Sequence, residues 1–237
     1  YSITVDQLEI ERKLPPATRP FVPEKGGVPK FLAKLKAKQP VTIVTKNALI
    51  LRDLDLLRPM ADQRLIHVML SVTTLDLELA RTMEPRTSPP QDRLRTIREL
   101  SQAGVPVCVN VAPVVPGLTD SEMPAILRAA REAGATAAGY IMLRLPWAVL
   151  TVFQDWLERN YPLKKPRIES LIRSMRGGKL NDPNFGSRMR GEGIMADQIE
   201  RVFDVFTKKH GLDGDLPPLD SSQFRPPRAA SGQLNLF

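Results

Sequence analysis

The sequence predicts an α/β protein in which about four parallel strands alternate with helices along residues 39–146. Its 237 residues, 42% of them hydrophobic, can bury one sizeable core. Short apolar, largely β-branched runs alternate with amphipathic segments, and two of these segments end at Gly104 and Gly134. Continuous apolar strands between amphipathic helices indicate a parallel sheet covered on both faces.

The apolar runs and the amphipathic segments between them predict the strands and helices of this fold in order. The apolar runs predict strands at 41–45, 66–71, 105–111 and 137–143. The intervening segments predict helices at 54–60, 76–83, 92–103 and a last one capped by Thr119 or Asp120 and ending at residue 133. Four β–α units are too few to close an eight-stranded barrel, so a partial barrel and an open doubly wound sheet both remain.

The two ends of the chain differ from this central region. Residues 1–10 are compatible with a short strand, but the prolines and the Gly26-Gly27 pair that follow predict a poorly ordered arm over residues 1–38, with a short basic helix at 30–38. Residues 147–212 predict a basic helical lobe with helices at 147–160, 167–176 and 196–210. The proline-rich residues 213–237 are expected to form a disordered tail.

Polar residues follow each predicted strand. In a parallel α/β fold, reactive groups gather where the strands end, which selects 45–47, 71–74, 110–113 and Arg144. Near this edge, Arg81, Glu84 and Arg93 form either a buried set of ion pairs or an ordinary salt bridge on a helix surface, and both readings remain open.

Composition limits the class of protein. The chain has one cysteine, Cys108, which excludes an internal disulfide framework and is expected to be buried in its apolar strand. His67 and His210 have no partner at metal-ligand spacing. No run of eighteen apolar residues and no secretion signal occur, so we expect a cytoplasmic protein without a membrane span. Because the first residue is Tyr1, the chain is either processed or a piece of something longer.

Positive charge is concentrated between residues 164 and 190. This window holds eight basic and two acidic residues, which accounts for six of the eight net positive charges. On charge alone the pattern favours a solvated helix-and-loop surface, and the alternative is a surface for nucleic-acid phosphates. The basic residues are Lys164, Lys165, Arg167, Arg173, Arg176, Lys179, Arg188 and Arg190.

Several stretches together carry a family resemblance. They are VTIVTKNALILRDLDLL (41–57), HVMLSVTTLDLELARTMEPR (67–86), RLRTIRELSQAGVPVCVNVAPVVPGLTD (93–120), AAGYIMLRLP (137–146), RGGKLNDPNFGSRMRGEG (176–193) and GQLNLF (232–237). In this order they resemble radical SAM proteins related to spore photoproduct lyase, a type labelled DNA repair photolyase. The resemblance implies a partial (β/α) barrel of radical SAM type, a 4Fe–4S cluster, S-adenosylmethionine and a nucleic-acid-related lyase activity.

The chain departs from that family where the cluster would bind. The family's CxxxCxxC loop follows its first barrel strand, whereas residues 1–38 contain no cysteine. A 4Fe–4S cluster takes three or four thiolates, so no cluster is expected on this chain alone. We expect a truncated form of the family, and missing strands would leave an exposed apolar edge at 41–44.

The resemblance carries over three cofactor contacts. Lys46 and Ser71 would contact the methionyl or ribose part of S-adenosylmethionine, and the backbone at Ala112 would lie along the adenine. The chemistry is compatible, since lysine offers a cation to a carboxylate and serine a hydrogen-bonding group to a ribose hydroxyl. A surface lysine and a structural serine are the alternatives.

The C-terminal peptide resembles the short motif by which bacterial repair and replication proteins dock on the DNA sliding clamp. Such a peptide places apolar side chains in a groove with a polar anchor at one end. Here the candidates are Gln233, Leu234, Leu236 and Phe237. The alternatives are a frayed terminus and one that folds back on its own domain. Together with the basic window, this peptide favours a second hypothesis, a non-catalytic module that binds DNA or the clamp.

Overall fold

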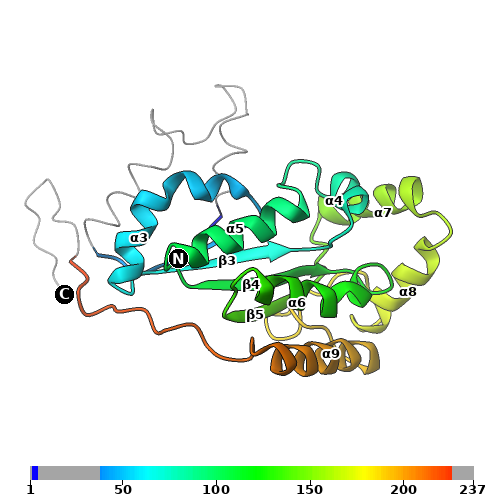
Figure 1. The fold of residues 1–237 in the computed structure, drawn as a ribbon. Coiled ribbons are helices and arrows are strands. Elements are labelled where there is room, and N and C mark those ends of the chain that lie inside the picture. Colours follow the sequence, from blue (N-terminus) through cyan, green and yellow to red (C-terminus); the bar gives the residue numbers. More distant parts are fainter. Residues whose placement is uncertain (1, 5–37, 226–237) are drawn as a thin grey trace, which may run out of the picture.

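The computed structural model of the chain describes residues 2–4 and 38–225. The expected helix at 30–38 lies almost entirely outside these residues, and the peptide at 233–237 lies wholly outside them. The described part is an α/β structure with the helical lobe at one end of the sheet (Figure 1).

One parallel sheet forms the centre of the molecule, with its strands side by side in the order in which they occur in the chain. The four strands expected between residues 39 and 146 are confirmed, and a short fifth strand precedes them. The strands are β1 (Ser2–Thr4), β2 (Val41–Thr45), β3 (Ile66–Val72), β4 (Val107–Val114) and β5 (Ala137–Met142). Because β1 pairs with β2, with Ile3 opposite Ile43, the expectation of an exposed edge at 41–44 is wrong.

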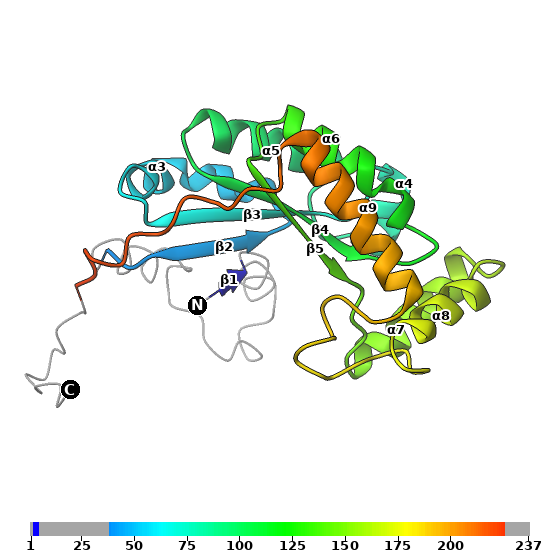
Figure 2. The same ribbon diagram turned by 90° about the horizontal axis from the view of Figure 1, so that it is seen from below.

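Helical segments connect the strands: η2 (Ala48–Asp53), α3 (Leu54–Asp62), α4 (Leu77–Met83), α5 (Pro90–Gln102), η3 (Asp120–Glu122) and α6 (Met123–Glu132). Right-handed crossovers between strands in sequential order bring their helices to one face of the sheet. Figure 2 shows α3, α5 and α6 on one face. The architecture is therefore a partial (β/α) barrel: among the described residues these helices cover one face of the sheet, while side chains on the other face, such as Ser71 and Asn110, are also buried.

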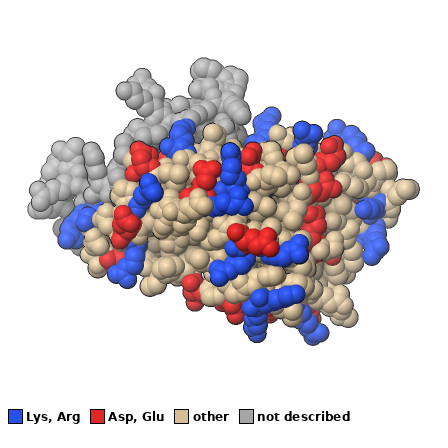
Figure 3. All heavy atoms as spheres, in the orientation of Figure 1, with Lys and Arg blue, Asp and Glu red and all other residues tan. Residues whose placement is uncertain are grey.

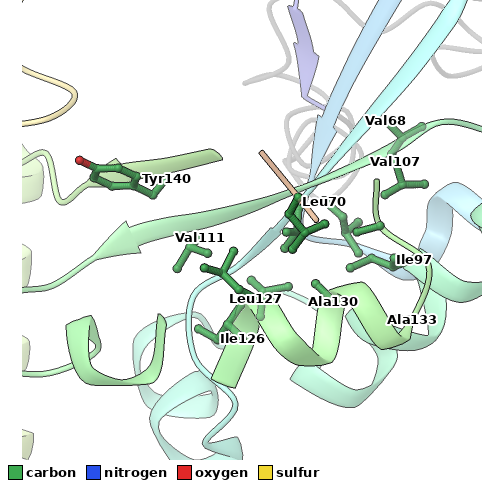
Figure 4. Packing of buried hydrophobic residues seen from close by; sticks show 14 of the residues in the cluster. Val68, Leu70, Ile97, Val107, Val111, Ile126, Leu127, Ala130, Ala133 and Tyr140 are labelled. Carbon is green, nitrogen blue, oxygen red and sulfur yellow. The ribbon is translucent and has the colours of Figure 1, made fainter. Parts of the chain in front are cut away.

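The main core lies between the sheet and these helices. Figure 4 shows Leu70 of β3 and Val107 of β4 facing Ile97 of α5 and Leu127 of α6. Since side chains alternate across a strand, Ser71, Cys108 and Asn110 face the opposite side of the sheet, where they are also buried. Cys108 is buried as expected, but it is not part of the core beneath the helices.

The predicted cap at the start of α6 is wrong in its geometry. Thr119 precedes η3 and makes no side-chain cap; its hydroxyl instead accepts a hydrogen bond from the Val115 amide at 2.9 Å. Asp120 accepts from the Gly117 amide, also at 2.9 Å. Both side chains therefore stabilise the turn after β4, because local side-chain acceptors compete for backbone donors wherever a chain turns.

The C-terminal helical lobe (residues 147–212) contains α7 (Ala148–Asn160), α8 (Lys165–Ser174) and α9 (Ile194–His210). A second apolar cluster joins α7 and α8 to the ends of β4 and β5; its members are Val115, Leu143, Leu145, Phe153, Leu157, Ile168, Ile172 and Leu180. Helix α9 packs along α6. The lobe is thus fixed to the end of the sheet at which the strands finish.

Residues 213–225, called the strap below, follow α9 and cross the start of the sheet rather than extending into solvent. The Leu212 carbonyl accepts from the Ala138 amide, the Pro217 carbonyl lies 2.6 Å from Nε2 of His67, and the Asp220 amide donates to the Arg64 carbonyl at 2.8 Å. These three contacts could not be predicted from the sequence, because the segment contributes a backbone group to each of them and backbone groups leave no mark in the side-chain pattern.

Candidate functional site

Polar groups meet at the carboxyl edge of the sheet, where β2, β3 and β4 end. Nζ of Lys46 lies 3.2 Å from Oγ1 of Thr73. The same Thr73 oxygen lies 2.7 Å from the Ala112 carbonyl and 3.0 Å from Oε2 of Glu84, so its single proton serves two acceptors. Parallel strands place their ends at one edge, and this brings together residues far apart in sequence.

Glu84 is the centre of this network. Its carboxylate forms salt bridges with both Lys46 and Arg93, and the Arg93 contact is 2.8 Å long. Arg93 is only 2% exposed, and its other donors reach the Ser88 carbonyl at 2.7 Å, the Ser71 carbonyl at 3.2 Å and the Thr87 hydroxyl. Of the predicted ion-pair residues, Glu84 and Arg93 do form a largely buried pair. Arg81 is exposed and takes no part, and Lys46 pairs with Glu84 in its place.

The pKa of Glu84 reflects this environment. Burial acts to raise it, but the Lys46 ammonium and the Arg93 guanidinium hold the pKa of this carboxyl below its ordinary value. A carboxyl whose pKa is lowered on folding stabilises the fold above its unfolded pKa, and that stabilisation is lost as the pH falls through the folded pKa.

We therefore expect Glu84→Gln to be less stable than the wild type at pH 7, and the difference to shrink as the pH falls below about 4.3, the ordinary glutamate pKa. Urea unfolding of both proteins at pH 7 and at pH 3 measures this. Glu78→Gln, at an exposed position on α4, is the matched control, and its difference in stability from the wild type should not shrink between pH 7 and pH 3. If Glu84→Gln is less stable than the wild type by the same amount at both pH values, Glu84 does not stabilise the fold through its ionised carboxylate.

Ser71 and Ala112 occupy the same edge but play different parts. Ser71 is buried opposite Asn110 in the β3–β4 register, and its side chain faces the side of the sheet away from the main core. Ala112 offers its carbonyl to Thr73. The structure thus brings all three sequence-based cofactor residues to one edge. It also adds Thr73, which sequence reasoning included only as part of a polar strand end.

Loops on either side hold this edge in place. The Glu122 carboxylate accepts from the Thr74 hydroxyl at 2.6 Å and from the Leu75 amide at 2.7 Å. The amide oxygen of Asn47 accepts from the Leu49 amide and from the Ser88 hydroxyl. Such cross-links between successive β–α loops pre-organise a binding edge before any ligand arrives.

An iron–sulfur cluster does not fit the residues of this chain. Cys108 is the single cysteine, it is 5% exposed within β4, and burial raises its pKa to about 11. Cluster ligands are thiolates, so a thiol held in its protonated form is a poor candidate. Across the part of the chain that the structure describes, no group of three or more His, Cys, Asp or Glu side chains is arranged to hold a metal ion.

S-adenosylmethionine fits the edge better. The network places two cations, Lys46 and Arg93, beside one carboxylate, Glu84, and such cations are the usual partners of a ligand carboxylate. Lys46 is half-buried rather than a solvated surface lysine. The Ser71 hydroxyl lies on the neighbouring strand, at a position suited to a polar group of the ligand.

The eight basic residues of the window do not form one uniform surface. Arg176 is 7% exposed, and its guanidinium donates to the carbonyls of Leu143, Arg188 and Ser187 at 2.8, 2.9 and 3.3 Å. Lys165 pairs with Glu158. Arg176 is thus engaged inside the lobe and Lys165 in a surface ion pair, so neither is a strong candidate for contact with phosphate.

The remaining basic side chains lie on the outside of the lobe. Arg190 is stacked on the Tyr140 ring, 3.8 Å from its centroid, and Arg188 lies 4.5 Å from the centroid of Phe185. The exposed members without such a stacked ring are Arg167, Arg173 and Lys179, while Lys164 lies over the ring of Tyr161. Figure 3 shows basic side chains at the end of the molecule formed by α7 and α8.

None of the helices within residues 38–225 is both long and apolar enough to cross a membrane.

Comparison with known proteins places this edge in a family context. Residues 19–130 match the model of the Radical SAM superfamily. An uncharacterized protein of Mycobacterium tuberculosis is 34% identical over 181 residues, which cover 76% of this chain and 49% of the relative. An uncharacterized protein of Methanocaldococcus jannaschii is 25% identical over 146 residues, or 62% of this chain and 53% of the relative. The chain spans about half the length of these relatives.

One solved structure shares the fold. A cysteine-to-serine mutant of spore photoproduct lyase matches with a TM-score of 0.53 at 17% identity, over 76% of this chain and 52% of that one. This likeness concerns the arrangement of strands and helices.

Proposed function

We propose that this chain, whose residues 19–130 match the Radical SAM superfamily model and whose fold is like that of spore photoproduct lyase, forms one wall of a radical SAM centre and receives S-adenosylmethionine there. We further propose that it does not bind the 4Fe–4S cluster by itself. One observation carries the proposal: Lys46, Ser71 and Ala112 meet at the carboxyl edge of the sheet, while the single cysteine is buried within β4.

Each residue has a distinct role in this proposal. Lys46, beside Glu84 at this edge, binds the carboxylate of the ligand in this proposal. Ser71 binds a ribose hydroxyl, and the Ala112 backbone, whose carbonyl is fixed by Thr73, lies along the adenine. When bound beside a reduced cluster, S-adenosylmethionine supplies a 5′-deoxyadenosyl radical, whereas the residues of this chain bind and orient the cofactor.

Calorimetric titration with S-adenosylmethionine tests the wall without requiring a cluster. We expect the wild type to bind and Lys46→Met to bind about tenfold more weakly, since a hydrogen bond to a charged group contributes about 1.5–3 kcal/mol. Arg58→Met, an exposed arginine on α3, is the control and should bind like the wild type. Equal binding by Lys46→Met would reject the role of Lys46, and no binding by the wild type would reject the proposal.

A second function is favoured by the exposed cations of the lobe. We propose that Lys164, Arg167, Arg173 and Lys179, with Arg188 and Arg190, contact nucleic-acid phosphates. Each phosphate contact releases counterions, which adds about 0.9 to the slope of log affinity against log salt concentration. The double variant Arg167→Ala/Arg173→Ala should therefore lower the slope for a DNA duplex by about 1.8. An unchanged slope would exclude these two side chains from the contact.

The C-terminal peptide supports a further partner in the same proposal, the bacterial DNA sliding clamp. Its apolar residues Leu234, Leu236 and Phe237, with Gln233 as polar anchor, are suited to an apolar groove. Titration of the clamp with the full chain and with a chain ending at Gly232 tests this. The full chain should bind more tightly, and equal affinity would reject the peptide as the docking element.

A further inference from the structure

Large apolar side chains on the helical lobe are unusually exposed. Within residues 38–225, the four most exposed are Leu163 (96%), Trp147 (94%), Phe185 (83%) and Ile194 (80%), and all four lie in this lobe. Single exposed hydrophobic residues need no explanation, but a group of them on one part of a surface marks an interaction site. Two of the four are aromatic, and these two lie in segments fixed by hydrogen bonds.

Trp147 is held outward just beyond the end of β5. Its backbone has a φ of 44° and a ψ of −123°, a conformation that costs free energy in a bulky residue and persists only where the surroundings impose it. The chain before it is fixed by Arg176, which binds the Leu143 carbonyl, and by Asn181, which accepts from the Leu145 amide at 3.2 Å. The indole is therefore presented from a rigid position at the carboxyl end of the sheet.

Phe185 belongs to the loop of residues 177–193, which is fixed to the same strand. The Met142 amide of β5 donates to the Met189 carbonyl at 2.9 Å, and the Ser187 hydroxyl binds the Asp182 carboxylate. Arg188 stacks on the Phe185 ring. A stacked guanidinium keeps its N–H groups available to phosphate or carboxylate acceptors.

Positive charge predominates in residues 164–190, the segment that contains Phe185. Among the described residues, Arg167, Arg173 and Lys179 form no salt bridge, whereas Asp155 pairs with Arg159 and Glu158 with Lys165, and the Asp182 carboxylate accepts from Ser187 and from the Asn184 amide. The partner of this surface should therefore carry negative charge together with flat apolar groups.

We propose that Trp147 and Phe185 stack against unpaired bases of a single-stranded nucleic acid whose phosphates follow the neighbouring arginines. This inference rests on the proposed nucleic-acid binding and specifies that the nucleic acid is single-stranded. Exposed aromatic rings beside a basic surface suit single strands, because a duplex hides the faces of its bases inside the stack. Both aromatic residues lie in segments fixed to β5, so the strand would lie at the carboxyl end of the sheet (Figure 1).

Fluorescence provides the test, because the chain has two tryptophans. Trp156 is half-buried between Phe153 and Tyr161, so Trp156→Phe preserves the packing and leaves Trp147 as the single reporter. Titration with a thymidine oligonucleotide should quench Trp147, and a duplex of equal length should quench it much less. In the wild-type background, Trp147→Ala and Phe185→Ala should each weaken single-strand binding about tenfold, while duplex binding changes little.

Leu163→Ala removes an equally exposed but non-aromatic side chain and should leave single-strand affinity unchanged. The inference is overturned if both aromatic variants bind the single strand as tightly as the wild type, or if duplex and single strand quench Trp147 equally. If the wild type binds neither nucleic acid, the proposed nucleic-acid function fails as well. The two failures are thereby distinguishable.

Discussion

Arg93→Ala is expected to lower the free energy of unfolding by about 3–5 kcal/mol, the usual cost of removing one partner from a buried charge pair. Arg93 is almost fully buried and donates to four different groups. Its loss leaves the carbonyls of Ser71 and Ser88 without this donor in a place that water cannot easily reach. Since small domains are stable by only about 5–15 kcal/mol, the variant should be close to unfolding.

Urea unfolding followed by circular dichroism measures this effect. Arg95→Ala is the matched control, because Arg95 lies on the same helix in exposed salt bridges with Asp92 and Glu99 and should cost at most about 0.5 kcal/mol. Arg93→Lys keeps the charge but loses the forked donor set, so we expect it to lie between the wild type and Arg93→Ala. Equal stability of Arg93→Ala and Arg95→Ala would show that the network does not support the fold.

Arg176→Ala is expected to release the loop of residues 177–193 and to destabilise the protein by about 3 kcal/mol. The guanidinium joins the end of β5 to the carbonyls of Ser187 and Arg188, which fixes the loop against the sheet. Without it, local opening of the loop should expose the backbone beside Arg188 and Arg190 to protease.

Limited trypsin digestion separates this local effect from global unfolding. Arg176→Ala should be cut in the loop faster than the wild type under native conditions, and its urea midpoint should fall. Lys179→Ala, an exposed position in the same loop, should change neither the midpoint nor the rate of cutting elsewhere in the loop. Loop cleavage at the wild-type rate in Arg176→Ala would contradict the role of Arg176 as the anchor.

The strands and helices were predictable because each leaves a periodic pattern. The strand at 41–45 is β-branched throughout, and the helix at 92–103 ends at a glycine; both appear within two or three residues of the expected bounds. The face that the helices cover was not predictable from the individual segments. It follows from the strand order, which no single segment encodes.

The location of the candidate site could be predicted from the sequence, but the pairing of its side chains could be predicted only in part. Polar strand ends identified the carboxyl edge, and the structure brings Lys46, Ser71 and Ala112 to it. That Lys46 shares Glu84 with Arg93 could not be predicted, because the pairing depends on how far α4 and α5 lean over the edge. Basic residues counted together in the sequence also separate in space, with Arg176 turning inward and Arg173 outward.

The same comparison changes the interpretation of the single cysteine. Cys108 is buried as its valine neighbours indicated, yet it lies on the side of the sheet away from the main core, the side to which Asn110 and Ser71 also point. Its pKa of about 11 keeps it protonated at neutral pH, so it is a small apolar side chain in this position.

Anaerobic reconstitution of the purified chain with iron and sulfide tests the central claim most directly. After desalting, we expect no stoichiometric iron or sulfide and no cluster absorbance, while S-adenosylmethionine still binds and still depends on Lys46. A 4Fe–4S cluster bound in stoichiometric amount to this chain, confirmed by iron analysis and electron paramagnetic resonance of the reduced protein, would contradict it.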